Sequence, residues 1–530
     1  MKKRMVSLFL ALLMTAGLLT GCGGGGSKTP TDPSDVVTLK VGLPMKALVS
    51  DYKNNDFTRY LEEKAGVKLD FMYFSDVASE ATQQLTLMCA ANEELPDVIL
   101  GLPFSYYRMI DYGDAGYFID LAPYIDEYAP NYKSQLEKQS DDIKGYVAKG
   151  IRDGHQYGLP RIINPAFDDL QSPMYINKTW LDALGLEIPT TLEELRNVLN
   201  LFKTADPNKN GQEDEIPMLG NRSIINYLIN AYILYDESVF NVTDGQLWDP
   251  VPTQEFRDAL IFANQLVQDG LYSKMSFTLS QNEMRNLISP AEGIARVGVF
   301  VGNHDSMTNV TDELKDFVAM PALEDATGKG GYTVVKESPR DWTAFVTADC
   351  ENPEAAIRFL DVFYMDETVT CQRHGTKDVY WVYQEGKNAC GTDSYAKIID
   401  ASGAWGGDSN WCGNMAGICT QWNYLPVLSD DVNTRILNSN RLASEQWQIL
   451  VSGKQPTERT INLTYTDEEF AVKDEKSAGV DRTIQETIME FASGVKDPND
   501  DATWNAFLAD LEKMGRSELM QIAQSAYSRG

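Results

Sequence analysis

The amino-acid sequence predicts an α/β fold, because strand-like segments alternate with amphipathic helical segments along the chain. Three strand-like segments near the start carry alternating or continuous apolar residues: 37–41, 67–73 and 97–100. Between them, apolar residues recur at helical spacing: Phe57, Tyr60 and Leu61, closed by Gly66, and then Ala81, Leu85, Met88 and Cys89. We therefore expect a largely parallel sheet, with ligands bound beyond the carboxyl ends of its strands.

Two later helices carry clear signals. Thr191 and Glu194 have the spacing of a capping box, in which each side chain bonds the other residue's backbone N–H. The apolar residues that follow share one helical face: Leu192, Leu195, Val198, Leu199 and Phe202. A second stripe stands near the end, before Gly515: Trp504, Phe507, Leu508, Leu511 and Met514. Both stripes predict packing against a core.

The first 22 residues have the pattern of a secretion signal. A basic head at 1–4 precedes an apolar segment at 6–19, which is too short to span a membrane comfortably. Leu19-Thr20-Gly21-Cys22 then matches a lipobox, the site at which bacterial lipoproteins are cut and their cysteine acylated, commonly with palmitate. We expect a signal peptide at 1–21, lipidation at Cys22 and a flexible tether at 22–36. The mature protein would be extracytoplasmic, anchored to the outer face of the bacterial cell membrane.

Composition excludes several classes of function. The 530 residues allow two or three domains or one two-lobed body, and a formal net charge of −31 disfavours nucleic acid as a partner. Only three histidines occur, far apart in the sequence, which gives little support to a histidine zinc site or a Ser-His-Asp triad. Neither a phosphate-binding loop nor a dinucleotide-binding glycine motif is present.

Residues 206–215 read D-P-N-K-N-G-Q-E-D-E, which is the strongest chemical motif within the chain. Oxygen-bearing side chains occupy positions one, three and five, and glycine at position six permits a tight turn. The pattern predicts a structural calcium site with these ligands: Asp206, Asn208, Asn210, Gln212, Asp214 and Glu215. It departs from an EF-hand because position twelve is Pro217, and the alternative is an Asx-rich turn without metal.

Several phrases, in their order along the chain, resemble the extracellular solute-binding lipoproteins of ABC transporters. They stand at 95–98, 153–160, 177–186 with 189–194, 352–356 and 504–527. The nearest resemblance is to the carbohydrate-binding group that includes the alginate-binding proteins, whose structural calcium loop has the pattern of residues 206–215. One family phrase, Tyr-Gly-x-Glu-Gly, is replaced here by the sequence at 374–378, which leaves the ligand chemistry open.

The resemblance implies a type II periplasmic-binding-protein-like fold, with two discontinuous α/β lobes joined by a hinge. We expect lobe 1 at 37–165 and 335–430, and lobe 2 at 166–334 and 431–530. Ligand would bind in the cleft and favour closure, and the closed form would deliver it to ABC permease subunits served by a separate ATPase. No catalytic residue is needed, and a monomer is the simplest expectation.

A cleft for sugars needs flat aromatic faces for C–H groups and polar side chains for hydroxyls. The candidates in loop-like surroundings are Tyr106, Tyr107, Arg161, Asn164, Phe167, Asp168, Trp342, Trp381, Trp405, Trp411 and Trp422. Trp405 and Trp411 are favoured among them because the residues between them have the composition of a loop.

Two other functional readings remain open. A peptide-binding or sensory lipoprotein of the same fold would also use aromatic residues in a large cleft. A surface glycan-degrading enzyme is less well supported, because the resemblance is to binding proteins; the carboxylate pair that it would need cannot be recognised from sequence.

Overall fold

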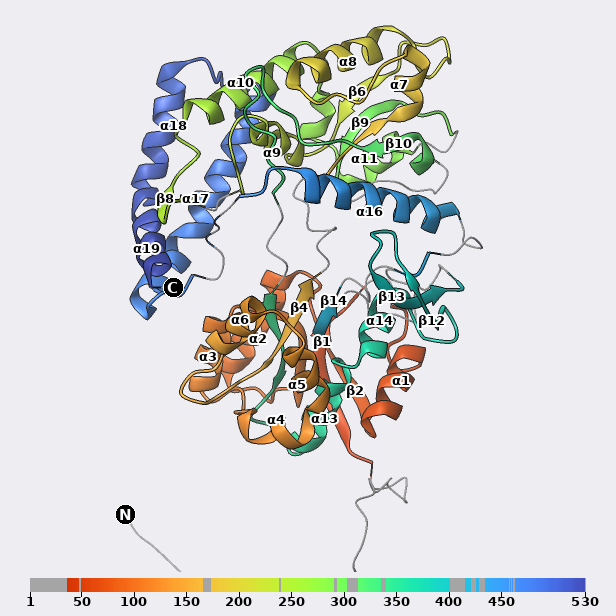
Figure 1. Cartoon of the computed structure of the whole chain (residues 1–530). Helices are drawn as coiled ribbons and strands as arrows, with labels where there is room; N and C mark the ends of the chain where they lie inside the picture. The colour runs from red at the N-terminus through yellow and green to blue at the C-terminus, as the bar shows by residue number, and fades with distance from the viewer. Residues whose placement is uncertain are drawn as a thin grey trace, which may run out of the picture.

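The chain folds into two α/β lobes, which lie one above the other in the computed structural model (Figure 1). The structure describes residues 36–46, 49–164, 173–237, 240–289, 293–302, 313–334, 340–400, 415–420, 426–428, 434–456, 458, 460 and 463–529. Lobe 1 holds the N-terminal strands and lobe 2 the C-terminal helices, and each lobe has its own large hydrophobic core.

Lobe 1 is built on a six-stranded sheet in the order β14-β4-β11-β3-β1-β2. The strands are β1 (Thr38–Pro44), β2 (Lys68–Phe74), β3 (Val98–Phe104), β4 (Leu159–Asn164), β11 (Arg340–Val346) and β14 (Gly417–Thr420). The surrounding helices are α1 (Asp56–Ala65), α2 (Ala78–Ala91), α3 (Tyr106–Asp114), α4 (Ala122–Tyr128), α5 (Pro130–Glu137), α6 (Asp141–Lys149), α13 (Pro353–Val362) and α14 (Asp366–His374). A separate hairpin, β12 (Trp381–Lys387) and β13 (Asp393–Ile398), extends toward lobe 2.

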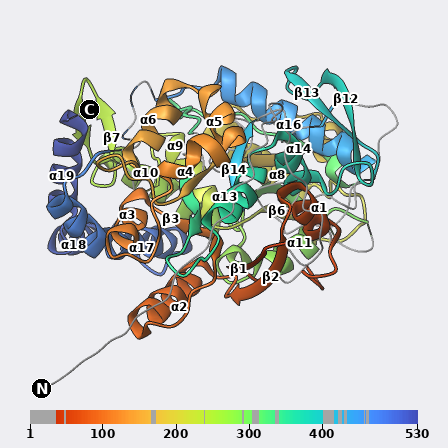
Figure 2. The ribbon, with the colours of Figure 1, turned by 90° about the horizontal axis from the view of Figure 1, so that it is seen from below.

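Lobe 2 has a four-stranded sheet in the order β10-β5-β9-β6. Its strands are β5 (Met174–Asn177), β6 (Ile216–Leu219), β9 (Val297–Val301) and β10 (Phe317–Ala319), beside a small hairpin of β7 (Asn241–Thr243) and β8 (Gln246–Trp248). Its helices are α7 (Lys178–Leu184), α8 (Leu192–Thr204), α9 (Ser223–Asn230), α10 (Gln254–Gln268), α11 (Gln281–Ile288), α16 (Thr434–Ser452), α17 (Asp467–Ser493), α18 (Asp501–Lys513) and α19 (Arg516–Ser528). Seen from below, α18 and α19 lie at one side of the molecule and α16 with the β12–β13 hairpin at the other (Figure 2).

Each sheet contains one strand that runs against the rest. Among the described strands of lobe 1, β11 is antiparallel to both neighbours while the other pairings are parallel, and β5 has the same position in lobe 2. Both strands begin where the chain has just crossed from the other lobe, so they run away from it. The remaining strands run toward the other lobe. The expected largely parallel sheet is thus correct for lobe 1 except at the strand that follows a crossing.

The local signals in the sequence are confirmed where the structure describes them. Gly66 ends α1 in the left-handed conformation, with φ of 68°, and Thr191 and Glu194 form the expected capping box of α8. Cys89 is buried in the core of lobe 1, and Trp504 in that of lobe 2. In the part of the chain that the structure describes, no helix has the length and apolar character that crossing a membrane requires.

Candidate ligand-binding site

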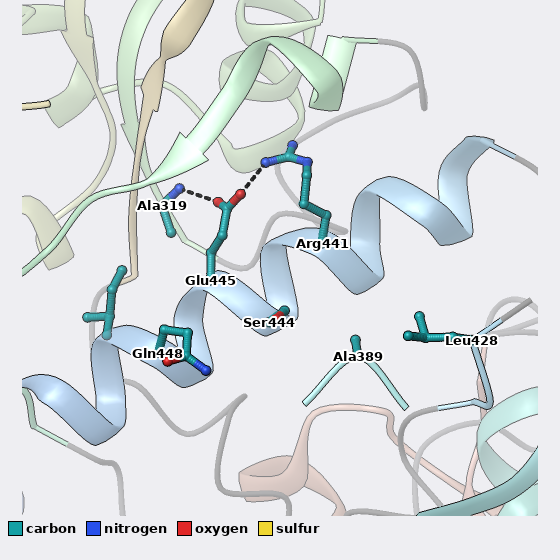
Figure 3. Close-up of a pocket in the computed structure, with 8 residues that line it drawn as sticks. Ala319, Ala389, Leu428, Arg441, Ser444, Glu445 and Gln448 are labelled. Carbon is teal, nitrogen blue, oxygen red and sulfur yellow. Dashed lines mark hydrogen bonds and ion pairs between the residues drawn. The ribbon is translucent and has the colours of Figure 1, made fainter. Parts of the chain in front are cut away.

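A pocket of about 520 Å³ lies between the two lobes, and we call it the interlobe pocket (Figure 3). Lobe 2 supplies Ala319 from β10 and five residues from α16; lobe 1 supplies Ala389 at the tip of the β12–β13 hairpin and Leu428. The α16 residues are Arg441, Ser444, Glu445, Gln448 and Ile449. The volume falls within the range of about 300–1,000 Å³ that is common for small-molecule sites.

The two charged side chains of this pocket, Arg441 and Glu445, bind each other and the backbone of lobe 2. Arg441 Nη1 lies 2.6 Å from Glu445 Oε1, and Glu445 Oε2 accepts a 2.9 Å hydrogen bond from the backbone N–H of Ala319. In Figure 3 both side chains point toward the strand that carries Ala319, away from Ala389 and Leu428. Arg441 also donates to the Phe317 carbonyl at 2.8 Å. Since the two charges neutralise each other, the pocket favours a ligand without net charge.

The tip of the hairpin contacts α16 beside this pocket. The thiol of Cys390 lies 4.0 Å from the Ala443 carbonyl, and both residues belong to a small apolar cluster with Val369 of α14 and Trp447 of α16. Trp447 is half-buried and was not a sequence candidate. In the sequence, Trp447 cannot be distinguished from a tryptophan in the core of a helical segment. Its position between the lobes is what makes it a candidate for ligand binding.

A second interlobe contact involves Tyr107, a sequence candidate for ligand binding. Its hydroxyl donates to the Tyr465 carbonyl at 2.8 Å and accepts from the Tyr465 N–H at 2.8 Å, and its ring stacks on Phe470 at 4.0 Å. Arg152 adds an ion pair with Asp467 at 3.6 Å. Burial raises the pKa of the Tyr107 hydroxyl, which therefore stays protonated and able to donate. In this structure Tyr107 joins the lobes directly.

We expect Tyr107→Phe to weaken this contact while keeping the ring stack. The variant loses both hydrogen bonds of the hydroxyl and leaves backbone groups of Tyr465 unpaired, a cost of about 1–3 kcal/mol. Small-angle X-ray scattering without ligand should then report a larger radius of gyration. The matched control is Tyr112→Phe, whose hydroxyl bonds Thr86 within lobe 1 at 2.8 Å. An unchanged radius in the Tyr107 variant would contradict an interlobe role.

Two further sequence candidates differ in their contacts, because the buried Tyr106 hydroxyl has no hydrogen-bond partner in the described part of the structure, whereas Arg161 is paired. The Tyr106 ring lies 4.0 Å from that of Tyr107, and burial is the main cause of its raised pKa. Arg161 forms a 2.5 Å ion pair with Asp341 across β4 and β11, at the strand ends next to the lobe crossing.

Asn164 ends β4, and its side chain lies outside the described part of the structure. Phe167, Asp168, Trp405, Trp411 and Trp422 lie outside the described residues, so their role stays a prediction.

Trp342 lies in the core of lobe 1, where a ligand cannot reach it in this structure. Its side chain has 0% exposure, and its indole packs against Gly150: a Cβ added to that glycine would lie 2.0 Å from the ring. Trp381 is also largely buried, at 3% exposure, and donates its indole N–H to the Gly375 carbonyl at 2.9 Å. It lines a different, smaller pocket beneath the β12–β13 hairpin. Neither tryptophan lines the interlobe pocket.

The predicted calcium loop connects α8 to β6 and is closed by its own side chains. Asp206 accepts the backbone N–H groups of Asn210 and Gly211, both at 3.1 Å, and Asn210 accepts that of Gln212 at 2.7 Å. The side-chain amides of Asn208 and Asn210 donate to Asp214 at 3.2 and 2.9 Å. These contacts alone describe a stable Asx-rich turn, which is the metal-free alternative.

Glu215 is the residue of this loop that the turn does not satisfy. Its Oε1 atom is buried without a hydrogen-bond partner, and burial, followed by repulsion from Asp206 and Asp214, raises its pKa. The pKa of Asp214 is lowered, chiefly by its bond from Asn210. A buried carboxylate oxygen beside two further carboxylates fits a divalent cation. Among the described residues, however, no group of three or more acidic, histidine or cysteine side chains is arranged to hold a metal ion.

Two α/β lobes, whose described segments alternate along the chain, and a pocket between them define a two-lobed ligand-binding protein with a type II periplasmic-binding-protein fold. The chain belongs to the family described as bacterial extracellular solute-binding protein, whose model matches residues 40–369.

Among curated proteins, the chain is similar to the fructooligosaccharide ABC transporter substrate-binding protein FusA of Streptococcus pneumoniae serotype 4. The two are 24% identical over 557 aligned positions, covering 98% of this chain and 97% of FusA. A structure of FusA described as an EF-hand mutant, in complex with fructo-nystose, superposes with a TM-score of 0.72 at 19% identity, over 93% of this chain and 99% of that one.

Two further solved structures share the fold. The HMO-binding, ABC-transporter-associated solute-binding protein of Bifidobacterium longum infantis has a TM-score of 0.74 at 21% identity, covering 93% of this chain and 99% of that chain. The alginate-binding protein AlgQ2, solved without calcium ion, has a TM-score of 0.71 at 22% identity, covering 93% and 98%.

Proposed function

We propose that this protein captures an oligosaccharide between its lobes and delivers it to an ABC import permease. The observation that carries the proposal is the interlobe pocket, which both lobes line and whose two charges neutralise each other. The full-length similarity to FusA, named for fructooligosaccharide transport, supports a carbohydrate ligand.

The lining of the interlobe pocket suits a neutral, hydroxyl-rich ligand. Ser444 and Gln448 offer donors and acceptors, Leu428 and Ile449 offer apolar contact, and half-buried Trp447 lies one helical turn from Ala443 at the hairpin contact. Sugars combine apolar C–H faces with hydroxyls and match this mixture. We propose the sequence candidates Trp405, Trp411 and Trp422 as further ring-stacking residues.

We further propose the cellular arrangement that the leader sequence predicts. Cleavage after Gly21 and acylation of Cys22 would anchor the protein to the outer face of the cell membrane through the tether at 22–36. The lobes would divide at 37–165 with 335–430 and at 166–334 with 431–530, and a monomer would dock on the permease while a separate ATPase supplies energy. The role requires binding alone, without catalysis.

We also propose that the loop at 206–215 holds a structural calcium ion. The ligands would be Asp206, Asn208, Asn210, Gln212, Asp214 and Glu215, and the ion would supply the positive charge that the buried Glu215 oxygen lacks. The FusA structure described as an EF-hand mutant supports a cation-binding loop in a protein of this fold.

The proposed function is tested by a thermal-shift screen of residues 27–530 with calcium present. We expect one class among neutral, amino and acidic oligosaccharides to raise the melting temperature in a concentration-dependent way, because ligand that binds only the folded state stabilises it. The neutral class is favoured, since Arg441 and Glu445 are paired. A shift from short peptides alone would contradict the proposal, and turnover of a bound glycan would indicate an enzyme.

Trp447→Ala links such a shift to the interlobe pocket. We expect this variant to reduce the ligand-induced shift, because the indole lies at the contact between α16 and the hairpin. The matched control is Trp248→Ala in β8, which is also half-buried but packs within lobe 2 and donates to Thr243. Equal ligand-induced shifts in the two variants would place the ligand elsewhere.

A further inference from the structure

A second pocket, of about 230 Å³, lies at the base of the β12–β13 hairpin, and we call it the hairpin pocket. All of its lining residues belong to lobe 1 and lie between positions 366 and 395: Asp366, Glu367, Thr370, Lys377, Trp381, Tyr383 and Tyr395. None of them lines the interlobe pocket. The two pockets are therefore separate sites.

The hairpin supplies the aromatic residues of this pocket. The rings of Tyr383 and Tyr395 stack 5.8 Å apart at an angle of 13°, and Trp381 precedes Tyr383 by two positions on the same strand and so shares its face. Tyr383 is 61% exposed, which is unusual for a large ring that packs in a protein. The Trp381 indole is held by its bond to Gly375, so the aromatic side of the pocket is pre-formed.

The polar residues of the hairpin pocket come from α14 and the turn after it. Glu367 pairs with Lys377 at 3.0 Å and with Lys64 of α1 at 3.3 Å, while Asp366 accepts a 2.5 Å hydrogen bond from the side chain of Gln135. A lysine in the lining disfavours a cationic ligand, and two carboxylates disfavour an anionic one. These groups can still exchange hydrogen bonds with hydroxyls, because an ammonium carries three donors and each carboxylate oxygen has more than one acceptor site.

We propose that the hairpin pocket is a second carbohydrate site, which holds a single neutral sugar ring against Tyr383 and Tyr395, with the largely buried Trp381 completing the lining. The volume lies below the range of about 300–1,000 Å³ usual for larger ligands, which suits one ring rather than an oligosaccharide. The two tyrosine rings contact the C–H face of the sugar ring, while Lys377 and the carboxylates bond its hydroxyls. The choice of a sugar over other neutral hydroxylated rings rests on the proposed function.

The hairpin also connects the two sites physically. The middle of its strands carries the tyrosines, and its tip carries Ala389 of the interlobe pocket and Cys390 of the contact with α16. A glycan longer than the interlobe pocket can hold would therefore find a second point of attachment on the same element, on lobe 1.

The test is saturation-transfer NMR on residues 27–530 with glucose, galactose, fructose and their methyl glycosides. We expect the double variant Tyr383→Ala/Tyr395→Ala to weaken binding of at least one of these sugars about five- to tenfold, which corresponds to roughly 1–1.4 kcal/mol for the loss of both ring contacts. Exposed Tyr383 can be replaced without disturbing the core, and Tyr383→Ala alone should show part of the loss. The control is Tyr124→Ala/Tyr128→Ala, a half-buried pair of rings 6.4 Å apart in α4.

The outcomes separate this inference from the proposed function. A monosaccharide signal that is lost in the hairpin variant and kept in Trp447→Ala supports the second site, even if no oligosaccharide binds between the lobes. A signal that Trp447→Ala removes while the hairpin variant keeps it overturns the second site and leaves the proposed function standing. Absence of any monosaccharide signal also overturns the second site.

Discussion

Trp342→Ala is expected to lower the free energy of unfolding by about 3–5 kcal/mol, the usual cost of truncating a buried tryptophan. The side chain is wholly buried in lobe 1, against Gly150 and beside the ring of Tyr146, so its removal leaves a cavity that the surrounding sheet and helix cannot readily fill. Denaturant unfolding monitored by circular dichroism measures the effect. Ligand affinity of the folded variant should change little.

A partner variant makes this prediction specific to the observed packing. Gly150→Ala would press a Cβ to within 2.0 Å of the indole and should cost about 1–3 kcal/mol through overpacking. In a Trp342→Ala background the clash disappears, so the same substitution should cost much less. Additive effects in this double-mutant cycle would contradict the contact. Normal stability of Trp342→Ala with loss of ligand binding would restore Trp342 as a binding residue.

Removal of calcium is expected to lower the melting temperature without abolishing ligand binding. A site occupied at about 100 times its dissociation constant contributes about 2.7 kcal/mol to the folded state, which a chelator removes. The loop lies at the start of β6, and Asp214 pairs with Arg296 at the start of β9. Both strands run toward lobe 1, so the loop is at the far end of the lobe 2 sheet.

Asp206→Ala is the matching variant for the calcium prediction. It should melt at a lower temperature than the wild type in calcium and should no longer respond to the chelator, while Asp244→Ala, a positive-φ aspartate in the turn between β7 and β8, should respond like the wild type. Differential scanning calorimetry of the three proteins decides the matter. If the chelator leaves the melting temperature of the wild type unchanged, the proposed calcium site is ruled out.

The raised pKa of Glu215 gives the calcium effect a pH dependence. Calcium needs the carboxylate ionised, and a raised pKa means that protons compete at a higher pH than for an ordinary glutamate. Stabilisation by calcium should therefore be complete at neutral pH and decline as pH falls. Without calcium the sign reverses, because folding then favours the protonated acid and the contribution of Glu215 falls as pH rises. In calorimetry across pH, Glu215→Gln should remove the calcium-free trend and reduce the pH dependence of the calcium effect, to which Asp206 and Asp214 would still contribute.

The sequence predicted those features that depend on neighbouring residues. Capping at Thr191, the glycine end of α1 and the turn at 206–215 all follow from side chains within a few positions of one another. The alternation of strands and helices indicated the α/β class for the same reason. The reversed strands could not be predicted this way, because the direction of β11 depends on the chain crossing from another lobe.

The ligand-binding residues were harder to predict because contacts distant in sequence determine their surroundings. The residues around Tyr107 have the composition of a ligand-binding loop. Its hydroxyl nevertheless forms a hydrogen bond with Tyr465, which lies 358 positions later in the sequence. Trp342 lies in a strand whose sequence does not indicate which of its two faces is buried. The indole is buried because it packs against Gly150, a residue distant in sequence. Ala319, Ala389 and Leu428 carry no chemical signal at all and line the interlobe pocket through position alone.

The reversed strand β11 also constrains the order in which the chain can acquire its structure. It pairs with β3 on one side and β4 on the other, and both of these strands are synthesised long before it. Until residue 340 is available, the middle of the lobe 1 sheet has two open edges, and such long-range pairing is slow to form. A nascent chain therefore remains without its central strand for most of synthesis. If the proposed leader at 1–21 directs export, that delay would keep the lobe 1 sheet incomplete until late in synthesis.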